Sequence, residues 1–258
     1  MGKNPSLNVV IPVFNEEKEV EESILMLRRF LSSELGDFDW HITIVDNAST
    51  DNTRLIANRL AENYDRVRTV HLNLKGRGRA VKFAWTKFIA DVNAYMDVDL
   101  STDLKHFPSL VRSLVRGYDI AIGSRNAYGS RVYGRSMLRT ITSKGYIALI
   151  KLFFMVHFSD AQCGFKAVTK SVVKELVPKI IDNEWFFDSE LLIVGEKSGY
   201  RIYEESKLTI ELPHDVTSYN ASIYSTKAWA ASVIFKIEAF NEMGTSEQVE
   251  IIVTYNCK

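Results

Sequence analysis

The chain has 258 residues, of which 46% are apolar and 25% are charged, a composition typical of a globular protein with one large domain. Lysine plus arginine and aspartate plus glutamate each number 32, so the net charge is zero and composition argues against a nucleic-acid partner. The two cysteines, Cys163 and Cys257, lie far apart without metal-ligand spacing, which argues against a disulfide framework and favours a reducing compartment.

Hydropathy gives no sign of a membrane span. No apolar run reaches the roughly 20 residues that a spanning helix needs, and residues 1–6 contain no stretch of signal-peptide type. The longest candidate, residues 146–158, is too short and carries Lys151 and His157. We therefore expect a soluble protein or one that lies at a membrane surface.

The first hundred residues alternate between short apolar runs and segments with helical periodicity. Strands are predicted over 7–13, 41–45, 67–72 and 94–98, and helices over 16–35, 52–63 and from a glycine-containing loop at 75–79 to residue 89. Strands that alternate with helices of this length predict an α/β fold with a Rossmann-like, mostly parallel sheet covered on both faces. Ligands bind such sheets outside the carboxyl ends of the strands.

The second half of the chain has a different character. After Pro108 we predict a helix to about residue 116 and a buried strand over 118–122. Near the C-terminus, residues 228–240 are a helix candidate for membrane contact or dimerisation, and residues 249–255 are predicted to form a strand.

Two carboxylates, Asp97 and Asp99, follow the fourth predicted strand directly. Carboxylate oxygens suit a hard divalent cation, and Mg²⁺ or Mn²⁺ held by two of them keeps positions open for the oxygens of a diphosphate. The five histidines are scattered without ligand spacing, so a zinc site is not expected.

A basic segment without any acidic residue extends from Arg125 to Lys151. Its arginines at 131, 135 and 139 share a face if the segment is helical. Apolar residues follow from Met137 to Phe158, so one interpretation is a helix in the membrane interface with its arginines near lipid phosphate. The alternative for residues 147–158 is a buried core helix.

Four ordered motifs, at residues 10–16, 45–53, 97–99 and 123–125, resemble those of glycosyltransferase family 2. The resemblance covers roughly residues 7–210 and implies a GT-A fold, a nucleotide-sugar bound across the first strands, and inversion at the anomeric carbon. Residues 160–166 and 185–192 look like those of the dolichyl-phosphate β-glucosyltransferases, whose nearest relatives are the dolichyl-phosphate mannose synthases.

The resemblance also implies residue roles. Asp46 would accept a hydrogen bond from the nucleobase, and Asp97 and Asp99 would hold Mg²⁺ or Mn²⁺. The other residues expected in the nucleotide-sugar site are Pro12, Phe14, Glu16, Gly76, Arg77 and Gln162. The expected catalytic residues are Asp99, Arg125, Asp160 and Asp188, and those expected at the acceptor phosphate are Arg131, Arg135 and Lys227.

Several of these roles have alternatives. Asp160 and Asp188 are candidates for a catalytic base, or they orient Lys166 or an arginine. Gly76–Gly78 either lets the backbone approach the nucleotide or is a plain turn, and Glu16 is either a pocket residue or an acid in a first helical turn. Cys163 is expected to be a small buried residue.

The leading hypothesis is a metal-dependent hexosyltransferase that moves a sugar, glucose from UDP-glucose, to dolichyl or polyprenyl phosphate. The alternatives are a family 2 enzyme that acts on a sugar hydroxyl, a GDP-mannose-dependent synthase, and a nucleotide-sugar-binding protein without catalysis. We expect a catalytic domain over 1–210, with a nucleotide-sugar half (7–125) and an acceptor half (126–210), and an extension over 211–258. The expected location is cytoplasmic, at the cytoplasmic face of a membrane, with homo-oligomerisation left open.

Overall fold

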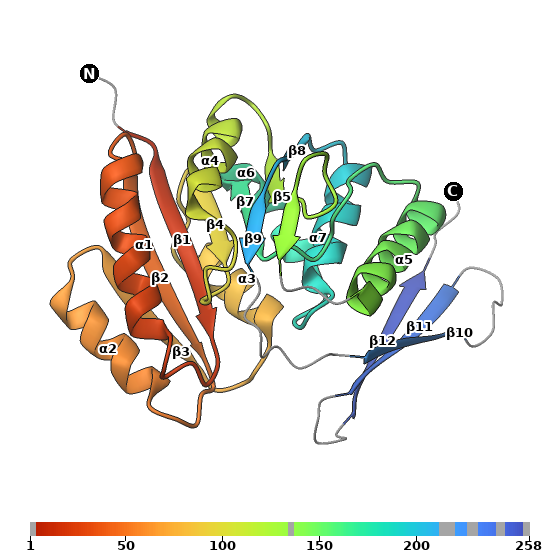
Figure 1. Ribbon diagram of the computed structural model, residues 1–258, viewed down its shortest axis with the longest axis horizontal. Coiled ribbons are helices and arrows are strands. Elements are labelled where there is room, and N and C mark those ends of the chain that lie inside the picture. The colour runs from red at the N-terminus through yellow and green to blue at the C-terminus, as the bar shows by residue number, and fades with distance from the viewer. Residues whose placement is uncertain (1–3, 134–136, 212–219, 226–231, 241–245, 255–258) are drawn as a thin grey trace. The chain divides into compact units, whose positions relative to one another are not determined.

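The computed structural model describes residues 4–133, 137–211, 220–225, 232–240 and 246–254 (Figure 1). The chain divides into two compact units, one of residues 1–133 and 147–211 and the other of residues 134–146 and 212–258. The predicted boundary at residue 210 and the division into halves 7–125 and 126–210 stay predictions.

The first unit contains a seven-stranded sheet in the order β3-β2-β1-β4-β7-β5-β8. Its strands are β1 (Ser6–Val13), β2 (Asp39–Asn47), β3 (Val67–Leu72), β4 (Val92–Met96), β5 (Ile120–Gly123), β7 (Phe165–Thr169) and β8 (Ile202–Glu205). Neighbouring strands are parallel except that β7 runs antiparallel to both β4 and β5. A separate parallel pair is formed by β6 (Arg131–Tyr133) and β9 (Thr209–Glu211). The prediction of a mostly parallel α/β sheet is confirmed.

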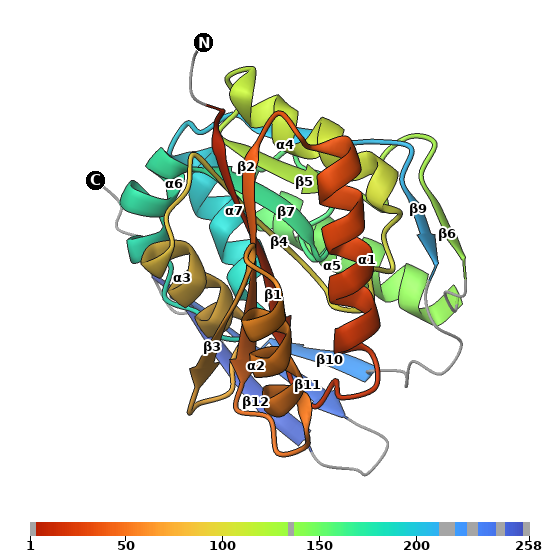
Figure 2. The same ribbon diagram turned by 90° about the vertical axis from the view of Figure 1, so that its left-hand side faces the viewer.

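Helices cover both faces of this sheet, and Figure 2 shows α1 and α3 on opposite sides of it. The α-helices are α1 (Val20–Glu34), α2 (Thr53–Asn63), α3 (Arg77–Lys87), α4 (Phe107–Val115), α5 (Met137–Phe154), α6 (Lys170–Glu175) and α7 (Phe187–Lys197), and short 3₁₀ turns are η1 (Leu104–His106) and η2 (Val177–Lys179). The apolar spacing of α1 explains its packing, because Val20, Ile24 and Leu27 are all buried against the sheet side of the helix.

The centre of the core lies under the strands that carry the predicted motifs. Val9, Val10 and Ala94 in β1 and β4 are fully buried. The indole ring of Trp85 packs between the rings of Tyr95 and Phe187, with centroid distances of 5.9 and 6.1 Å. These ring contacts join α3, β4 and α7, so elements far apart in sequence converge below the end of β4.

Strand register aligns the carboxyl ends of the first three strands. Val13 of β1 pairs with Asp46 of β2, and Asp46 pairs with His71 of β3. Because these pairs occupy the last residues of each strand, the loops that follow begin at one edge of the sheet.

The second unit contains an antiparallel sheet of β10 (Asn220–Ser225), β11 (Ser232–Phe240) and β12 (Ser246–Thr254). The prediction of a helix over 228–240 is therefore wrong, since residues 232–240 form a strand that pairs on both sides. Residues 226–231 lie outside the described residues. The strand predicted over 249–255 is confirmed as part of β12. Among the described residues, no helix combines the length and apolarity that crossing a membrane requires.

Candidate active site

The loops that follow β1 and β2 are locked together by hydrogen bonds. The backbone N–H of Asn15 donates to Ser49 Oγ (3.0 Å), and the N–H of Thr50 donates to Asn15 Oδ1 (2.8 Å). The N–H of Glu16 donates to Thr53 Oγ1 (2.7 Å), which joins the first loop to the start of α2. Predicted nucleotide-site residues on different strands are thus held in one rigid edge.

Asp46 lies in this edge with its carboxylate fully buried and both oxygens occupied. Oδ1 accepts from the N–H of Ser49 (3.1 Å), and Oδ2 lies 2.5 Å from Nδ1 of His71. The neighbouring Asn47 accepts from the N–H of Gly76 (2.9 Å) through Oδ1. Asn47 therefore anchors the loop that leads into α3.

Two further predicted residues, Pro12 and Phe14, lie at the end of β1 and just beyond it, and both are half-buried. The ammonium nitrogen of Lys75 lies 4.0 Å from the centre of the Phe14 ring, a cation–π contact across the strand ends. The edge therefore presents an aromatic ring and a positive charge.

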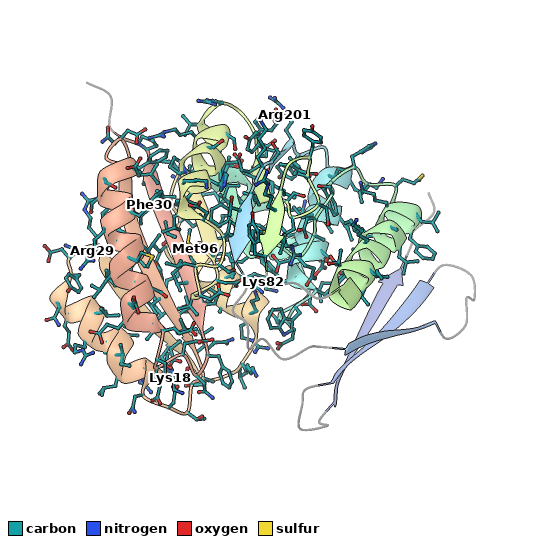
Figure 3. The ribbon with its side chains drawn as sticks, in the orientation of Figure 1. Lys18, Arg29, Phe30, Lys82, Met96 and Arg201 are labelled. Atoms are coloured by element: carbon teal, nitrogen blue, oxygen red, sulfur yellow. The ribbon has the colours of Figure 1, made fainter. Side chains whose placement is uncertain are left out.

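The glycines before α3 serve close packing of the chain on itself. A side-chain carbon at Gly76 would lie 2.6 Å from the carbonyl oxygen of Asn183, and one at Gly78 would lie 2.5 Å from Cβ of Phe187. The N–H groups of Gly78 and Arg79 already donate to carbonyls of the 183–184 loop. The same loop is held by Lys82, whose ammonium group donates to the three carbonyls of residues 180–182 (Figure 3).

Arg77 lies at the centre of the site with a side chain that is only 13% exposed. Its guanidinium lies 4.9 Å from the ring centre of Trp185 and 5.4 Å from that of Tyr95. Nη2 approaches Oδ1 of Asp97 at 2.7 Å, yet within the described residues neither Nη2 nor Nε makes a hydrogen bond of acceptable geometry. Burial would lower the pKa of Arg77, but Asp97, Tyr95 and Asp188 raise it, so the group is a permanent cation.

Asp97 and Asp99 follow β4, where the sequence places the cation site. Asp97 is half-exposed and Asp99 is exposed, with Asp99 Oδ1 accepting from the N–H of Ser101 (3.0 Å). Burial, Asp99 and Asp188 raise the pKa of Asp97 in spite of Arg77. Burial and the charges of Glu19, Asp99, Asp51 and Asp97 raise the pKa of Glu16 to about 7.

This crowding of carboxylates is the electrostatic signature of a place that favours a cation. Oxygen ligands from Asp97 and Asp99 fit a hard divalent ion such as Mg²⁺ or Mn²⁺. Within the described residues, no group of three or more His, Cys, Asp or Glu side chains is arranged to hold a metal by itself.

Asp188 belongs to a buried polar network below the site. Its Oδ1 lies 2.9 Å from the ammonium nitrogen of Lys166 and accepts a hydrogen bond from Tyr95, and its Oδ2 lies 4.0 Å from Nε of Arg77. Both Lys166 and Asp188 are buried, and Lys166 also donates to the carbonyl of Cys163 (2.5 Å). Cys163 is buried, as predicted, and this burial raises the pKa of its thiol to about 12.

Asp160 and Arg125 form a second ion pair. Nε and Nη2 of Arg125 donate to the two carboxylate oxygens at 2.6 and 2.8 Å, and the backbone N–H of Arg125 adds a third bond. Burial would raise the pKa of Asp160, but Arg125 holds it below its usual range. Gln162 donates to the carbonyl of Trp185 (3.1 Å) and to Ser189 Oγ (3.2 Å), so it fixes the loop that carries the exposed Trp185.

The predicted acceptor residues are only partly described. Arg131 is exposed in strand β6, whereas Arg135 and Lys227 lie outside the described residues. The condition under which Arg131, Arg135 and Arg139 would share one helical face is not met at Arg131, because Arg131 lies in strand β6, which pairs with β9.

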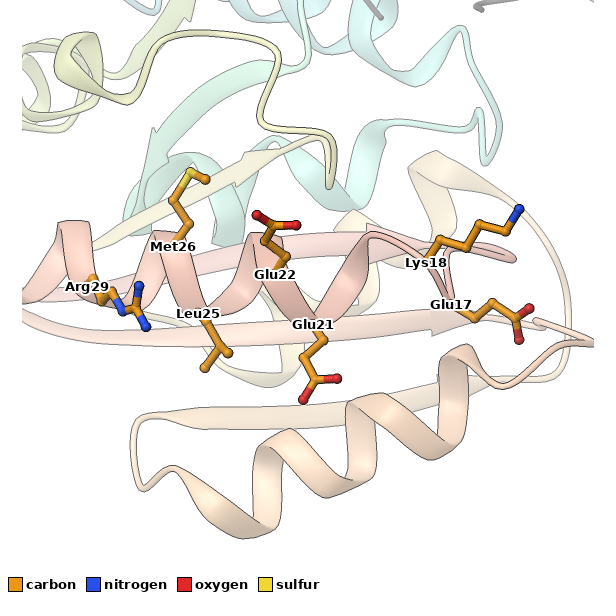
Figure 4. A pocket seen from close by; sticks show the side chains of 7 residues that line it. All are labelled: Glu17, Lys18, Glu21, Glu22, Leu25, Met26 and Arg29. Atoms are coloured by element: carbon orange, nitrogen blue, oxygen red, sulfur yellow. The ribbon is translucent and has the colours of Figure 1, made fainter.

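A hollow also lies along α1 and the residues just before it (Figure 4). It is lined by Glu17, Lys18, Glu21, Glu22, Leu25, Met26 and Arg29. Its lining contains none of the predicted site residues and consists mostly of long charged side chains on a helix surface.

Sequence reasoning missed His71 and Tyr95 as members of the site. The alternative that Asp188 orients Lys166 agrees with the structure, because the two side chains form a buried ion pair. His71 gave no signal in the sequence, because its proximity to Asp46 arises from the pairing of β2 with β3.

Comparison with known proteins places the chain in context. Residues 8–177 match the model of the family described as glycosyl transferase family 2. The chain is 32% identical over 229 residues to glycosyltransferase AglD of Haloferax volcanii, covering 85% of this chain and 36% of AglD. It is 27% identical to a dolichyl-phosphate beta-glucosyltransferase of Saccharomyces cerevisiae (77% of this chain, 65% of the relative) and 31% identical to a dolichol-phosphate mannosyltransferase of Pyrococcus furiosus (93% and 68%). The chain thus spans between about a third and two thirds of the length of these relatives.

Among solved structures, the fold is similar to that of glucosyl-3-phosphoglycerate synthase from Mycobacterium tuberculosis, crystallised with Mn²⁺, UDP-glucose and phosphoglyceric acid. The TM-score is 0.59 at 17% identity, covering 81% of this chain and 71% of the other. The likeness shows a shared GT-A fold. With this fold, the matched family model over residues 8–177 and a relative at 32% identity, the chain belongs to glycosyl transferase family 2.

Proposed function

We propose that the chain is an inverting, metal-dependent hexosyltransferase that moves glucose from UDP-glucose to a polyprenyl phosphate such as dolichyl phosphate. The observation that carries the proposal is the position of Arg77 beside Asp97. A buried, permanently charged guanidinium lies 2.7 Å from Asp97, the first aspartate of the pair that follows β4. Such an arrangement suits a ligand that brings both phosphate oxygens and a divalent cation.

In this proposal Asp97 and Asp99 hold Mg²⁺ or Mn²⁺. A bound divalent ion supplies Lewis-acid stabilisation of the negative charge on the departing diphosphate. Arg77 donates guanidinium hydrogens to the diphosphate and replaces part of the hydration that the diphosphate loses on binding. Glu16 lies close enough to Asp97 and Asp99 for their negative charges to help raise its pKa to about 7. A bound cation would compensate this repulsion among the carboxylates.

The donor binds across the ends of β1, β2 and β3. Phe14 and Pro12 line the nucleoside pocket, and Asp46 anchors its base-binding end. Gln162 positions Trp185, whose half-exposed ring is available to pack against the transferred sugar. The names of the relatives support either a glucose or a mannose donor, and the uracil form is the one we propose.

The state of the two candidate bases favours a phosphate acceptor. A sugar hydroxyl must lose a proton as it attacks, so its transfer needs a carboxylate free to accept one. Asp160 is engaged in a bidentate pair with Arg125, and Asp188 is engaged with Lys166 and Tyr95. A phosphomonoester is already an anion at neutral pH and needs only positioning and charge screening. Arg125 therefore acts as a catalytic cation in the proposal, oriented by Asp160, while Asp188 pairs with Lys166.

A surface of α5 supports contact with a membrane that contains the acceptor. Ile141, Leu152 and Phe153 are all at least 44% exposed, and Lys144 and Lys151 lie on the same helix. Apolar side chains beside basic ones suit a helix at the interface of an anionic membrane. We propose association with the cytoplasmic face, with Arg131 near the acceptor phosphate.

The experiment that tests the proposed acceptor compares two substrates and two variants. Purified protein with Mn²⁺ and labelled UDP-glucose or GDP-mannose is given either dolichyl phosphate or a free oligosaccharide. The proposal predicts transfer to the lipid phosphate, with Asp160→Asn retaining a measurable rate because Asp160 is no base. Transfer only to the oligosaccharide, abolished by Asp160→Asn or Asp188→Asn, would establish the hydroxyl-acceptor alternative. Donor binding without transfer to either would leave a binding protein.

A further inference from the structure

Asp46 and His71 form a hydrogen-bonded pair at the strand ends. They are direct neighbours in the β2–β3 register, and Oδ2 of Asp46 lies 2.5 Å from Nδ1 of His71. The Asp46 side chain is 1% exposed, whereas the His71 side chain is 25% exposed. Of the two, the imidazole is the group with surface open to a ligand.

The chemistry of the pair fixes which ring nitrogen faces a ligand. The second oxygen of Asp46 accepts from the N–H of Ser49 (3.1 Å), and with a side chain only 1% exposed the carboxylate presents almost no surface to a ligand. The carboxylate accepts a hydrogen bond from Nδ1–H, and a neutral ring with its hydrogen on Nδ1 carries a lone pair on Nε2. In this tautomer Nε2, the ring nitrogen that does not contact Asp46, is a hydrogen-bond acceptor whose direction is set by the Asp46 contact.

We infer that His71 reads the nucleobase of the donor through Nε2, and that Asp46 is a positioning residue that acts through His71. The inference rests on the proposed function for the presence of a nucleoside diphosphate in the site. What is new in the inference is that His71, and not Asp46, selects the base.

An acceptor at this place selects a chemical class of base. Uracil presents a ring N–H at position 3 and guanine presents one at position 1, and either donates to Nε2. Cytosine and adenine present a bare ring nitrogen at the corresponding positions, so two lone pairs would face each other and one buried acceptor would lose its partner. His71 thus favours uracil over cytosine and guanine over adenine.

The test measures dissociation constants of UDP, CDP, GDP and ADP by calorimetry with Mn²⁺ present. UDP and CDP carry the same ribose and diphosphate, so contributions of Arg77 and the metal cancel in their ratio, as they do for GDP and ADP. We expect the wild type to prefer the N–H-bearing member of at least one pair by tenfold or more. His71→Phe should bring that ratio close to one.

Two further variants make the result specific. Asp46→Asn offers an amide hydrogen to Nδ1, which moves the ring hydrogen to Nε2 and should lower the ratio while His71 remains in place. His41→Phe, the same substitution at a half-buried position of β2 remote from the strand end, should leave the ratio unchanged. Thermal unfolding of each variant shows whether it is folded. If His71→Phe does not fold, Asp46→Asn still tests the role of His71.

The outcomes separate the two claims. Retention of the wild-type ratio in His71→Phe and Asp46→Asn, or a wild type that binds without discrimination, would overturn the role of His71 and leave the proposed function intact. Failure of the wild type to bind any of the four nucleotides would overturn the proposed function itself, and the inference with it.

Discussion

A side-chain carbon at Gly164 would lie 1.8 Å from Oδ2 of Asp97. The backbone of Gly164 also accepts from the N–H of Asp97 through its carbonyl, so the two residues are in contact along both side chain and main chain. The absence of a side chain at Gly164 is therefore what allows the Asp97 carboxylate its position above β7.

Gly164→Ala should displace Asp97, because no side-chain carbon fits at that distance. The same carbon would lie 2.7 Å from Nη2 of Arg77, so the guanidinium would move as well. We expect at least a tenfold loss of Mn²⁺ affinity and of transfer rate, measured by titration calorimetry and by turnover. Gly145→Ala is the matched control, since nothing lies within 4 Å of the carbon it adds. Equal behaviour of the two variants would show that the Gly164 contact has no functional consequence.

Lys166→Met should destabilise the fold by about 3–5 kcal/mol, because it leaves the buried Asp188 carboxylate without its ammonium partner. The double variant Lys166→Met/Asp188→Leu should lose less than the sum of the two single variants, since it removes both charges. Urea unfolding of the four proteins measures this coupling. Simple additivity would mean that the ion pair contributes nothing beyond its separate side chains.

Glu16→Gln should stabilise the metal-free protein in a pH-dependent way. The pKa of Glu16 is about 7 in the folded state and 4.5 by its ordinary value, so its ionisation disfavours the fold. This penalty is absent below the lower value, grows between the two, and is complete above pH 7. We expect a gain in unfolding free energy of about 1 kcal/mol at pH 8, after allowance for solvent screening, and no gain at pH 4.

The measurement for Glu16 is urea unfolding in the presence of a chelator at both pH values. Glu62→Gln, an exposed position on α2, provides the control for a loss of one negative charge. A stabilisation of Glu16→Gln that is the same at pH 4 and pH 8 would contradict the electrostatic explanation.

Arg131→Ala should raise the KM for polyprenyl phosphate several-fold and leave the KM for the donor unchanged. Its side chain is exposed on β6, while the backbone bond of Arg131 to Leu208 is independent of the side chain. Steady-state kinetics with each substrate varied in turn measures the effect. Arg54→Ala, exposed on α2, is the comparison, and a change in donor KM alone would remove Arg131 from the acceptor site.

Much of the sheet could be predicted because its elements are long and locally patterned. The strand predicted over 67–72 has the observed bounds, and helix α1 follows its apolar spacing from Val20 onward. The prediction of a helix over 228–240 was wrong because a short apolar run fits both the helical period of about 3.6 residues and the strand period of two. There, pairing of β11 with β10 and β12 determines that the segment is a strand, and these partners cannot be recognised from the segment's own residues.

The place of Asp97 and Asp99 directly after β4 could be predicted, because that motif follows its strand without a break. The site was not predictable where long-range register brings residues together. The burial of Asp46 against His71 depends on β2–β3 pairing, and the Lys166–Asp188 pair depends on β7 entering the sheet antiparallel between β4 and β5. Gly76 and Gly78 show the same limit, because the loop that they accommodate is about 100 residues away in sequence.

Transfer of labelled glucose from UDP-glucose to dolichyl phosphate in detergent, measured for the wild type and Asp99→Ala with and without Mn²⁺, is the most direct test. We expect lipid-soluble product from the wild type only with the metal, and a loss of at least 100-fold in Asp99→Ala at nearly unchanged stability, because Asp99 is exposed. Asp65→Asn, exposed before β3, should behave as the wild type. Metal-independent transfer, or undiminished transfer by Asp99→Ala, would contradict the assignment of Asp97 and Asp99 as the metal site.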